Sequence, residues 1–494
     1  MKCSLLVRAG VLVTDSDSEP LRDAAVCIQE DRIIAIGPYH SLLQKYKPER
    51  ECGGLTNLVM PGLINAHDHG RGPSALQMGI PDDHLESWIL DLMRLPPVDA
   101  FNNTAFSALE QLESGITTTT NSFYQGSDYA ETFEKTLAAY RQTGIRAGLI
   151  LSTLDRSIVV ELLESVKPTL PVALQGFVAQ LLTQQSATDQ TQYFELLKQY
   201  QQQLSDGRQW VLGGPVSVHW CSQSLLEQIW GATAELGLAI QTHLLESPYQ
   251  KSSAQRRYGK SAVQFMDEAG LLTPNLSCAH CVHTTEEDIQ RLSRAGVSVV
   301  HNAGSNLRLR NGVMPLPLML EHGVNVALGL DSQTLNDDAD MFQEMRLVSR
   351  LYPQGGPDSR QVFTMATING ARALGIDDQT GSLAVGKKAD LLLIDTQKTK
   401  GSFLSTGTDI FDRIVLHTRP DAIAAVVVDG EVVLSNGRHC RMDKAAIGQK
   451  IAEQLELPLS KEQLSFNRQI SAIKPYLQMS LNEADAYGTE NSST

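Results

Sequence analysis

VMPGLINAHDHG, residues 59–70, joins a short apolar run to two histidines separated by one aspartate. The run LINA lacks polar alternation and is bounded by turn residues, which predicts a strand buried on both faces. Side chains alternate along a strand, so His67 and His69 point to one face and Asp68 to the other. Two imidazoles on one face can share a metal ion. A His-x-His pair without other signals is more often a pair of surface histidines. Whether this pair binds a metal ion therefore depends on other residues in the chain.

The composition is that of an ordinary globular protein. The 494 residues are 42% hydrophobic and 20% charged, which suits one large α/β domain and a smaller one. The net charge of −15 argues against a nucleic-acid partner, because such partners need a concentrated basic surface. No apolar run approaches about eighteen residues, so no membrane span is expected.

The N-terminus and the cysteines predict a cytoplasmic protein. The opening MKCSLLVRAGVLVTDSD has an arginine inside its apolar run and lacks a small-residue cleavage site, which predicts a first β-strand rather than a signal peptide. Seven cysteines, an odd number scattered through the chain, suit reduced thiols. Cys278 and Cys281 form a CxxC with no second CxxC, so we expect no cysteine metal site.

Two β-rich ends enclose a long segment in which apolar runs alternate with helical stretches. Residues 1–58 and 384–440 are β-rich, and 441–494 predict helices and a polar tail. The expected strands between the ends are 63–69, 115–123, 145–152, 214–220, 238–246, 275–281, 297–303 and 325–332. A further apolar run, 171–179, is a ninth possible strand. Eight such repeats fit a closed (β/α)8 barrel, whose active site lies where its strands end.

Histidines gather at the ends of these expected strands. Each one alone would be an ordinary buried histidine, but together they converge on the face where barrels carry their chemistry. The residues concerned are His67, His69, His219, His243, His280 and His301, with Asp331 at the end of the eighth strand.

The motifs resemble those of the amidohydrolase superfamily over nearly the whole chain. In order they are PGLINAHDH, QTHLLES, AHCVH, HNAGSNLRLRNG, ALGLDS, GSLAVGKKADLLLID and VVVDGEVV. The chain is most similar to the mononuclear branch of cytosine, guanine and adenosine deaminases and triazine hydrolases. Within it, GLDSQTLNDDADMFQEMRLV and HDHGRG are closer to hydroxyatrazine aminohydrolases than to guanine deaminase.

This resemblance implies an α/β fold, a (β/α)8 TIM barrel with a small β-sandwich domain formed from both chain ends. The implied domains are 1–58 and 384–440 for the two parts of the sandwich, 59–383 for the barrel, and 441–494 for a helical extension and tail.

The resemblance also implies one divalent metal ion, held by His67, His69, His243 and Asp331. Such a set leaves room for a water whose pKa the ion lowers to about 7. Binuclear members of the superfamily use a carboxylated lysine at the end of strand four, where this chain has PVSVHW. We therefore expect a single ion, first of all Zn²⁺, although the same ligands accept Fe²⁺ or Mn²⁺.

Further site residues follow from the resemblance. Glu246 in HLLES would carry a proton to the departing nitrogen, although a surface or helix-capping glutamate is the alternative. His280 would stabilise the attacking hydroxide or the developing oxyanion, and Asp331 would also accept the water's proton. The expected substrate contacts are His219, Trp220, Trp88, Asn302, Asn306 and Asp337.

The implied activity is hydrolytic removal of an amino or alkylamino group from a nitrogen heterocycle of purine, pyrimidine, pterin or triazine type. Hydrolysis of an acyclic amide or urea is the main alternative, and dechlorination is a further one. A non-catalytic scaffold protein is an alternative that is not an enzyme. The presence of all four metal ligands, Glu246 and His280 argues against it. A small-molecule substrate and a homodimer or higher homo-oligomer are expected.

Overall fold

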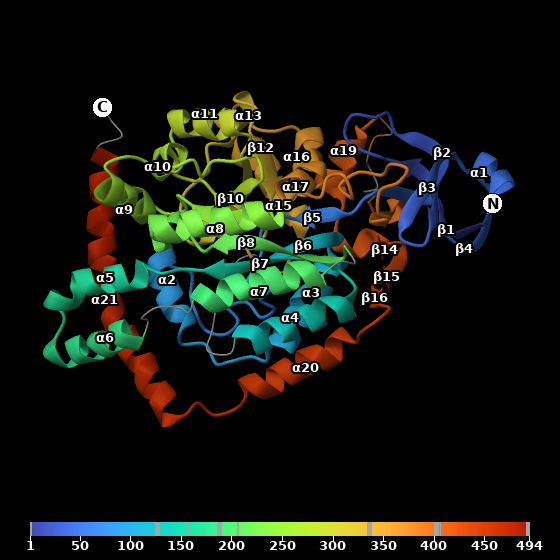
Figure 1. Cartoon of the computed structure of the whole chain (residues 1–494). Helices are drawn as coiled ribbons and strands as arrows, with labels where there is room; N and C mark the ends of the chain where they lie inside the picture. Colours follow the sequence, from blue (N-terminus) through green and yellow to red (C-terminus); the bar gives the residue numbers. More distant parts are fainter. Residues whose placement is uncertain are drawn as a thin grey trace.

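In the computed structural model, the chain forms a parallel β-barrel, a small mixed sheet beside it and a pair of C-terminal helices (Figure 1). The structure describes residues 2–123, 129–156, 158–184, 190–204, 207–332, 338–399, 405 and 407–490. Helices occupy most of the links between barrel strands. Their bounds are α2 (Leu85–Leu92), α3 (Ala100–Glu113), α4 (Tyr129–Thr143), α5 (Ile158–Val166), α6 (Val172–Gln184), α7 (Gln190–Gln203), α8 (Gln223–Leu236), α9 (Pro248–Tyr258), α10 (Ala262–Glu268), α11 (Glu286–Ala295), α12 (Ala303–Arg308), α13 (Leu316–Glu321), α15 (Met341–Leu351), α16 (Ser359–Met365) and α17 (Ile368–Ala373).

The barrel consists of eight strands that pair in chain order, each parallel to the next. The last strand returns to the first, where the N–H of Ala66 donates to the carbonyl oxygen of Leu328 at 2.9 Å. The expected (β/α)8 barrel is confirmed. The strands are β5 (Leu63–Asn65), β6 (Ile116–Phe123), β7 (Arg146–Thr153), β8 (Gln209–Pro215), β9 (Ile240–Leu244), β10 (Leu276–His280), β11 (Ser298–His301) and β12 (Asn325–Leu328).

The expected bounds of the fourth strand were wrong. We expected residues 214–220, but β8 ends at Pro215 and Val218–Trp220 form a 3-10 helix. Gly213 and Gly214 both lie inside β8, which begins at Gln209. A Cβ on Gly213 would lie 2.4 Å from the Thr233 side chain, so close packing explains the glycine there. The ninth possible strand, 171–179, belongs to helix α6 instead.

Strands from both chain ends form one mixed sheet in the order β16-β15-β14-β13-β4-β1-β2-β3. Strand β4 leads through Gly62 directly into β5, so this sheet is continuous in sequence with the barrel. The strands are β1 (Lys2–Leu12), β2 (Leu21–Gln29), β3 (Arg32–Pro38), β4 (Lys47–Pro61), β13 (Leu391–Asp395), β14 (Ile423–Val428), β15 (Glu431–Ser435) and β16 (Arg438–His439). Short helices α1 (Tyr39–Lys45), α18 (Thr396–Thr399) and α19 (Ile410–Asp412) accompany it.

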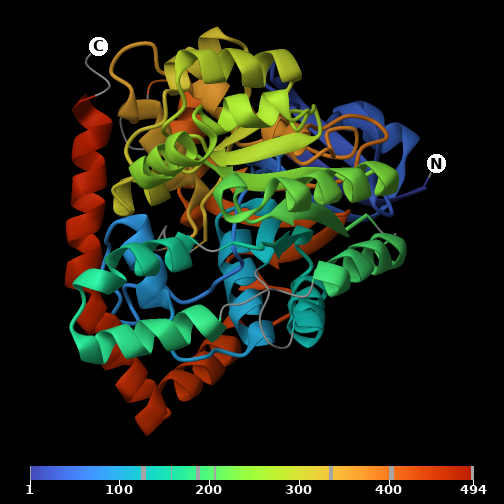
Figure 2. The same ribbon diagram turned by 60° about the vertical axis from the view of Figure 1, so that its left-hand side comes forward.

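The C-terminal segment runs from the mixed sheet to the opposite side of the barrel (Figures 1 and 2). Helix α20 (Lys444–Leu455) packs against α3, and α21 (Lys461–Glu490) packs against α2, α5, α6 and α9.

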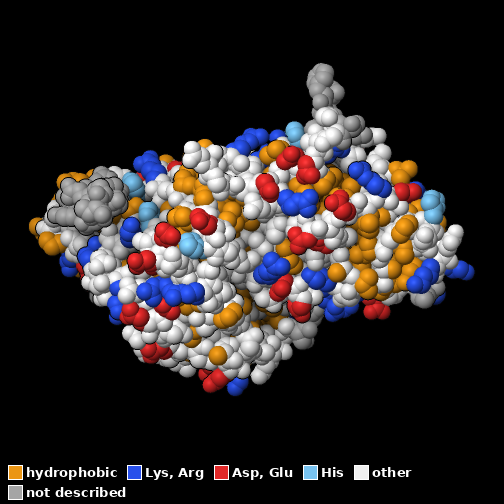
Figure 3. All heavy atoms as spheres, turned by 90° about the horizontal axis from the view of Figure 1, so that it is seen from above, with side chains coloured by type: hydrophobic (Ala, Val, Ile, Leu, Met, Phe, Trp, Pro, Cys, Tyr) orange, Lys and Arg blue, Asp and Glu red, His pale blue; other side chains and the backbone are white. Residues whose placement is uncertain are grey.

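The surface shows no concentration of one charge on the face drawn in Figure 3, where acidic and basic side chains are interspersed. Among the described helices, none has both the length and the hydrophobicity that crossing a bilayer requires.

A buried ionic cluster joins the barrel to the mixed sheet. The guanidinium of Arg146, at the start of β7, donates from Nε to Asp390 at 2.8 Å and also pairs with Asp429 in the β14–β15 turn. The side chains of Arg146 and Asp390 are 1% and 0% exposed. Asp390 also accepts from the Thr380 hydroxyl at 3.1 Å and the Asp429 N–H at 2.8 Å. The buried charges of Arg146 and Asp390 are therefore each neutralised or hydrogen-bonded by groups in fixed positions.

Replacing Asp390 with asparagine should lower the free energy of unfolding by about 3–5 kcal/mol, because the Arg146 charge stays buried while a main partner loses its charge. Urea unfolding followed by circular dichroism measures the change. The matched control is Asp378→Asn at an exposed position, which should stay within about 0.5 kcal/mol of wild type. Equal unfolding curves for the two variants would contradict a structural role for this cluster.

Candidate active site

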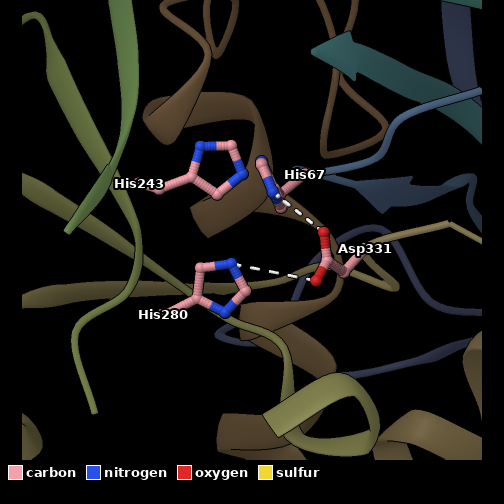
Figure 4. A group of neighbouring side chains, drawn as sticks. All are labelled: His67, His243, His280 and Asp331. Carbon is pink, nitrogen blue, oxygen red and sulfur yellow. Dashed lines mark ion pairs between the residues drawn. The ribbon is translucent and has the colours of Figure 1, made fainter. Parts of the chain in front are cut away.

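The ends of four barrel strands bring four histidines and one aspartate together. His67 and His69 follow β5, His243 lies in β9, His280 ends β10, and Asp331 follows β12. One ligand atom from each of His67, His243, His280 and Asp331 lies within 4.8 Å of the others (Figure 4). The expected convergence of these strand ends is thus present in the structure.

Three of these imidazoles are held in the same tautomer. His67 Nδ1 lies 2.7 Å from the amide oxygen of Gln241, and His69 Nδ1 lies 3.0 Å from the carbonyl oxygen of Ser122. His243 Nδ1 lies 2.5 Å from the carbonyl oxygen of Val216. Each acceptor oxygen requires the proton to be on Nδ1, which leaves the Nε2 lone pair free. This is the arrangement that orients histidines toward a metal ion.

The Nε2 atoms converge on one oxygen of Asp331. Asp331 Oδ1 lies 3.2 Å from His67 Nε2 and 3.0 Å from His69 Nε2, and His69 Nε2 lies 3.4 Å from His243 Nε2. Asp331 Oδ1 and His67 Nε2 are buried without a hydrogen-bond partner. Lone pairs that face a carboxylate at these distances repel each other unless a cation lies among them. The donor set therefore fits a divalent metal ion.

His280 lies on the other side of the Asp331 carboxylate. Its Nε2 is 3.8 Å from Asp331 Oδ2 and 3.6 Å from Glu246 Oε2, and its Nδ1 is 2.9 Å from Asn306 Oδ1. The same Asp331 Oδ2 accepts a hydrogen bond from Ser305 at 2.6 Å. This position favours His69 over His280 as the third imidazole ligand and leaves His280 between two carboxyl groups.

Asp331 is placed by three consecutive backbone N–H groups. Those of Leu330, Asp331 and Ser332 donate to Asn65 Oδ1 at 2.9 Å, to the His67 carbonyl at 3.0 Å and to Asp68 Oδ2 at 3.1 Å. Asp331 and Ser332 have φ angles of 60° and 85°. A non-glycine residue seldom adopts such angles unless its surroundings impose them. The β5 loop thus fixes the position of the carboxylate ligand.

The surroundings of the two carboxyl groups shift their pKa values in opposite directions. Burial, followed by the charges of Asp331 and Glu86, raises the pKa of Glu246 well above its usual range. Burial would also raise the pKa of Asp331, but the neighbouring imidazoles of His280, His67 and His69 hold it well below its usual value. The site therefore pairs a carboxyl group that favours the ionised form with one that favours the protonated form, an arrangement that suits acid–base chemistry.

Burial lowers the pKa of two of the imidazoles around Asp331. Burial lowers the pKa of His243 well below its usual value, and burial lowers that of His280 to about 4. Neutral imidazole is the form that binds a metal ion.

A cavity of about 320 Å³ opens onto the cluster. At one end it is lined by His69, His243, Glu246 and Asp331, whereas its walls are largely apolar. The wall residues include Leu85, Trp88, Ile89 and Leu92 of α2, together with Trp220 and Leu309. The cavity suits a flat, largely apolar molecule whose reactive end faces the polar cluster.

The expected substrate contacts divide into three groups. Trp88 and Trp220 line the cavity. Asn302 and Asn306 do not, because they lie against the His280 ring, with Asn302 Nδ2 3.4 Å from both ring nitrogens. His219 is also absent from the lining and is buried, and burial and the charge of Arg257 lower its pKa to about 3. Asp337 lies outside the described residues.

Sequence reasoning missed several residues that orient the site. Gln241 accepts from His67 and donates from Nε2 to the Ala66 carbonyl at 2.9 Å, so it fixes both the ring and its backbone. Asp68 accepts from Asn65 Nδ2 at 2.7 Å and the Gly70 N–H at 2.6 Å besides Ser332. The alternation expected along residues 63–69 placed Asp68 on the opposite face from the histidines, and that expectation was the available signal for this supporting role, although β5 itself ends at Asn65.

Comparison with known proteins gives a consistent result. The family model described as Amidohydrolase family matches residues 58–433. A 5'-deoxyadenosine deaminase of Methanosarcina barkeri is 29% identical, over 91% of this chain and 98% of its own. A 5-methylthioadenosine/S-adenosylhomocysteine deaminase of Acetivibrio thermocellus is 28% identical over the same shares of the two chains.

Solved structures with the same fold include two zinc-containing proteins. An adenosine deaminase from Xanthomonas campestris with bound zinc has a TM-score of 0.77 and 24% identity, and covers 92% of this chain and 98% of its own. The atrazine chlorohydrolase of Arthrobacter aurescens TC1, complexed with zinc, has a TM-score of 0.77 and 21% identity over 91% and 100%. At these identities, the two structures support the fold.

Replacing Gly329 with alanine should weaken metal binding, since its Cβ would lie 2.4 Å from Asn302 Oδ1 and 2.9 Å from His67 Cβ. Displacement of His67 should reduce metal affinity roughly tenfold or more, as other changes behind metal ligands do. Elemental analysis after dialysis against a weak chelator measures the effect. Gly231→Ala in α8 is the control, because no atom lies within 4 Å of the added methyl group. Full metal retention by Gly329→Ala would contradict the tight packing behind His67.

Proposed function

Because this chain belongs to the amidohydrolase family, we propose that it hydrolyses the exocyclic amino group of adenine nucleosides, with 5'-deoxy or 5'-thioether nucleosides as preferred substrates. The expectation of an enzyme that acts on C–N bonds other than peptide bonds is confirmed. The observation that carries the proposal is one cavity lined both by metal-ligand residues and Glu246 and by aromatic and aliphatic side chains.

His67, His69, His243 and Asp331 would hold one divalent ion, with Zn²⁺ expected first and Fe²⁺ or Mn²⁺ accepted by the same donors. When bound, the ion lowers the pKa of a water molecule to about 7, so that a strong nucleophile is available at neutral pH. A single ion is proposed because the described cavity lining contains no lysine that could be carboxylated to bridge two ions.

Glu246 is placed to protonate the heterocycle. Asn311 Nδ2 donates to its Oε1 at 3.1 Å, and the Glu246 N–H donates to Gln250 Oε1 at 2.9 Å, so the carboxyl group is fixed at the cavity wall. Addition of water to the amino-bearing carbon of adenine moves negative charge onto the adjacent ring nitrogen. A carboxylic acid at this position neutralises that charge in the transition state.

Asp331 and His280 would manage the proton of the attacking water. The ionised Asp331 can accept that proton, and His280 Nε2 lies between Asp331 Oδ2 and Glu246 Oε2 at 3.8 and 3.6 Å. Protons can therefore return to Glu246, which must donate again because an amide anion is too basic to leave unprotonated. His280 in this position can also orient the water.

The cavity walls support the choice of substrate class. Trp88 and Trp220 offer flat faces for a purine, and Leu85, Ile89 and Leu309 extend the apolar surface. An unsubstituted or thioether 5' carbon can be buried there without loss of hydrogen bonds. A hydroxyatrazine-like triazine would fit the same walls, so the finer resemblance to triazine aminohydrolases stays a prediction.

Two wider expectations remain proposals. All seven cysteines are free thiols, which suits the reducing cytoplasm. The homodimer or higher homo-oligomer expected from the sequence also stays a prediction.

The substrate proposal is tested by an ammonia-release assay with the metal-loaded enzyme. The panel contains 5'-deoxyadenosine, 5'-methylthioadenosine, adenosine, guanine, cytosine, an aminated pterin, amino- and alkylamino-triazines, N-acyl amino acids and aryl ureas, with free alkylamine also measured. The highest kcat/KM is expected for the two 5'-modified adenine nucleosides, because the apolar walls can bury their 5' carbon. Turnover of triazines alone, or of amides and ureas alone, would contradict the nucleoside proposal.

Glu246→Gln should keep the bound metal and the fold while turnover falls by roughly two to four powers of ten, the usual contribution of a positioned acid–base group. Steady-state kinetics, elemental analysis and circular dichroism on the same preparation separate these effects. Activity within a few fold of wild type would show that the proton takes another route.

Elemental analysis of active wild-type protein should find about one equivalent of divalent metal, as expected for three imidazoles and one carboxylate. His67→Ala should lose most of it. Two equivalents in fully active enzyme would refute the single-ion proposal.

A further inference from the structure

Helix α2 lies between the active-site cavity and the C-terminal helix α21. On one side, Leu85, Trp88, Ile89 and Leu92 of α2 line the cavity. On the other side, Leu90 of α2 belongs to a buried apolar cluster with residues of α5, α6, α9 and α21. The residues that α21 contributes are Ile470, Ile473, Leu477 and Leu481. The wall that faces the substrate is therefore supported from behind by the end of the chain.

Ion pairs and a hydrogen bond also join α21 to α2. Lys474 of α21 pairs with Asp83, just before α2, at 3.0 Å and with Asp91 in its last turn. The side chains of Lys474, Asp83 and Asp91 are 15%, 9% and 0% exposed. Asp83 also accepts from Ser87 at 2.8 Å and from Gln478 of α21 at 3.0 Å. One ammonium group thus neutralises a carboxylate at each end of α2.

Helix α2 also contacts the segment that carries Glu246. The hydroxyl of Ser247, the residue after Glu246, donates to the carboxylate of Glu86 in α2. Tyr249, in the first turn of α9, belongs to the same apolar cluster as Leu90 and α21. Figures 1 and 2 both show α21 running alongside α2, α5 and α9. A displacement of α21 would move both sides of the cavity.

We propose that α21 positions the substrate-binding wall of the active site, and that Lys474 is the positioning residue that locks α2 in place. Lys474 touches none of the metal ligands and does not line the cavity. Its loss should leave the chemical groups intact while α2 shifts or loosens. The effect should therefore fall on substrate binding rather than on the chemical step.

The test uses the full-length, metal-loaded enzyme and the substrate that wild type turns over fastest, whichever class that is, so the outcome does not depend on the nucleoside proposal. Lys474→Met should raise KM roughly tenfold to a hundredfold, the size expected when a positioning contact far from the chemistry is lost. Turnover should stay within about threefold and metal content should be unchanged. Hydrogen exchange of the α2 amides should become faster, because their support is lost.

Lys474→Arg retains both ion pairs and should restore KM, and Lys474→Gln provides a milder variant if the methionine variant folds poorly. Lys450→Met on α20 is the matched control, since Lys450 is exposed and α20 packs against α3. An unchanged KM in Lys474→Met and Lys474→Gln would overturn the proposal. A rise in KM accompanied by parallel losses of kcat and metal content would also overturn it, because together they would indicate general destabilisation.

Discussion

The joint between the first and last barrel strands is the constraint on which the active site depends. Three successive N–H groups of the β12 loop are held by the β5 loop, and this contact forces Asp331 and Ser332 into left-handed backbone angles. Such angles cost about 1–3 kcal/mol each and persist only where the surroundings over-determine them. The same hydrogen bonds hold the Asp331 carboxylate close to His67 and His69. Closure of the barrel therefore also sets the geometry of the proposed metal site.

Much of this arrangement could be predicted because, in a parallel barrel, the place of a residue along its strand determines where it lies in the fold. Parallel strands end at the same rim, so a histidine or aspartate that follows an apolar run must lie near the others. That rule located His67, His69, His243, His280 and Asp331 correctly. It misplaced His219, because β8 ends at Pro215 and the chain turns into a 3-10 helix before His219.

The residues that could not be predicted act through contacts between distant segments. Gln241 looks like any polar residue in a strand until its amide is seen between His67 and Ala66. Asn302 and Asn306 stand in the expected motif, yet their side chains contact His280 rather than the cavity. Lys474 lies almost four hundred residues from the carboxylates it pairs with, and no local pattern distinguishes it from a solvated lysine.

Because α21 follows the barrel in sequence, the parts of the active site are synthesised in a fixed order. The paired histidines of β5 leave the ribosome early, but the ligand set is incomplete until Asp331 has emerged and the barrel can close. The cavity wall gains its support only when α21 follows. A chain synthesised only as far as the barrel would therefore contain all four proposed metal ligands but not the helix that supports the cavity wall.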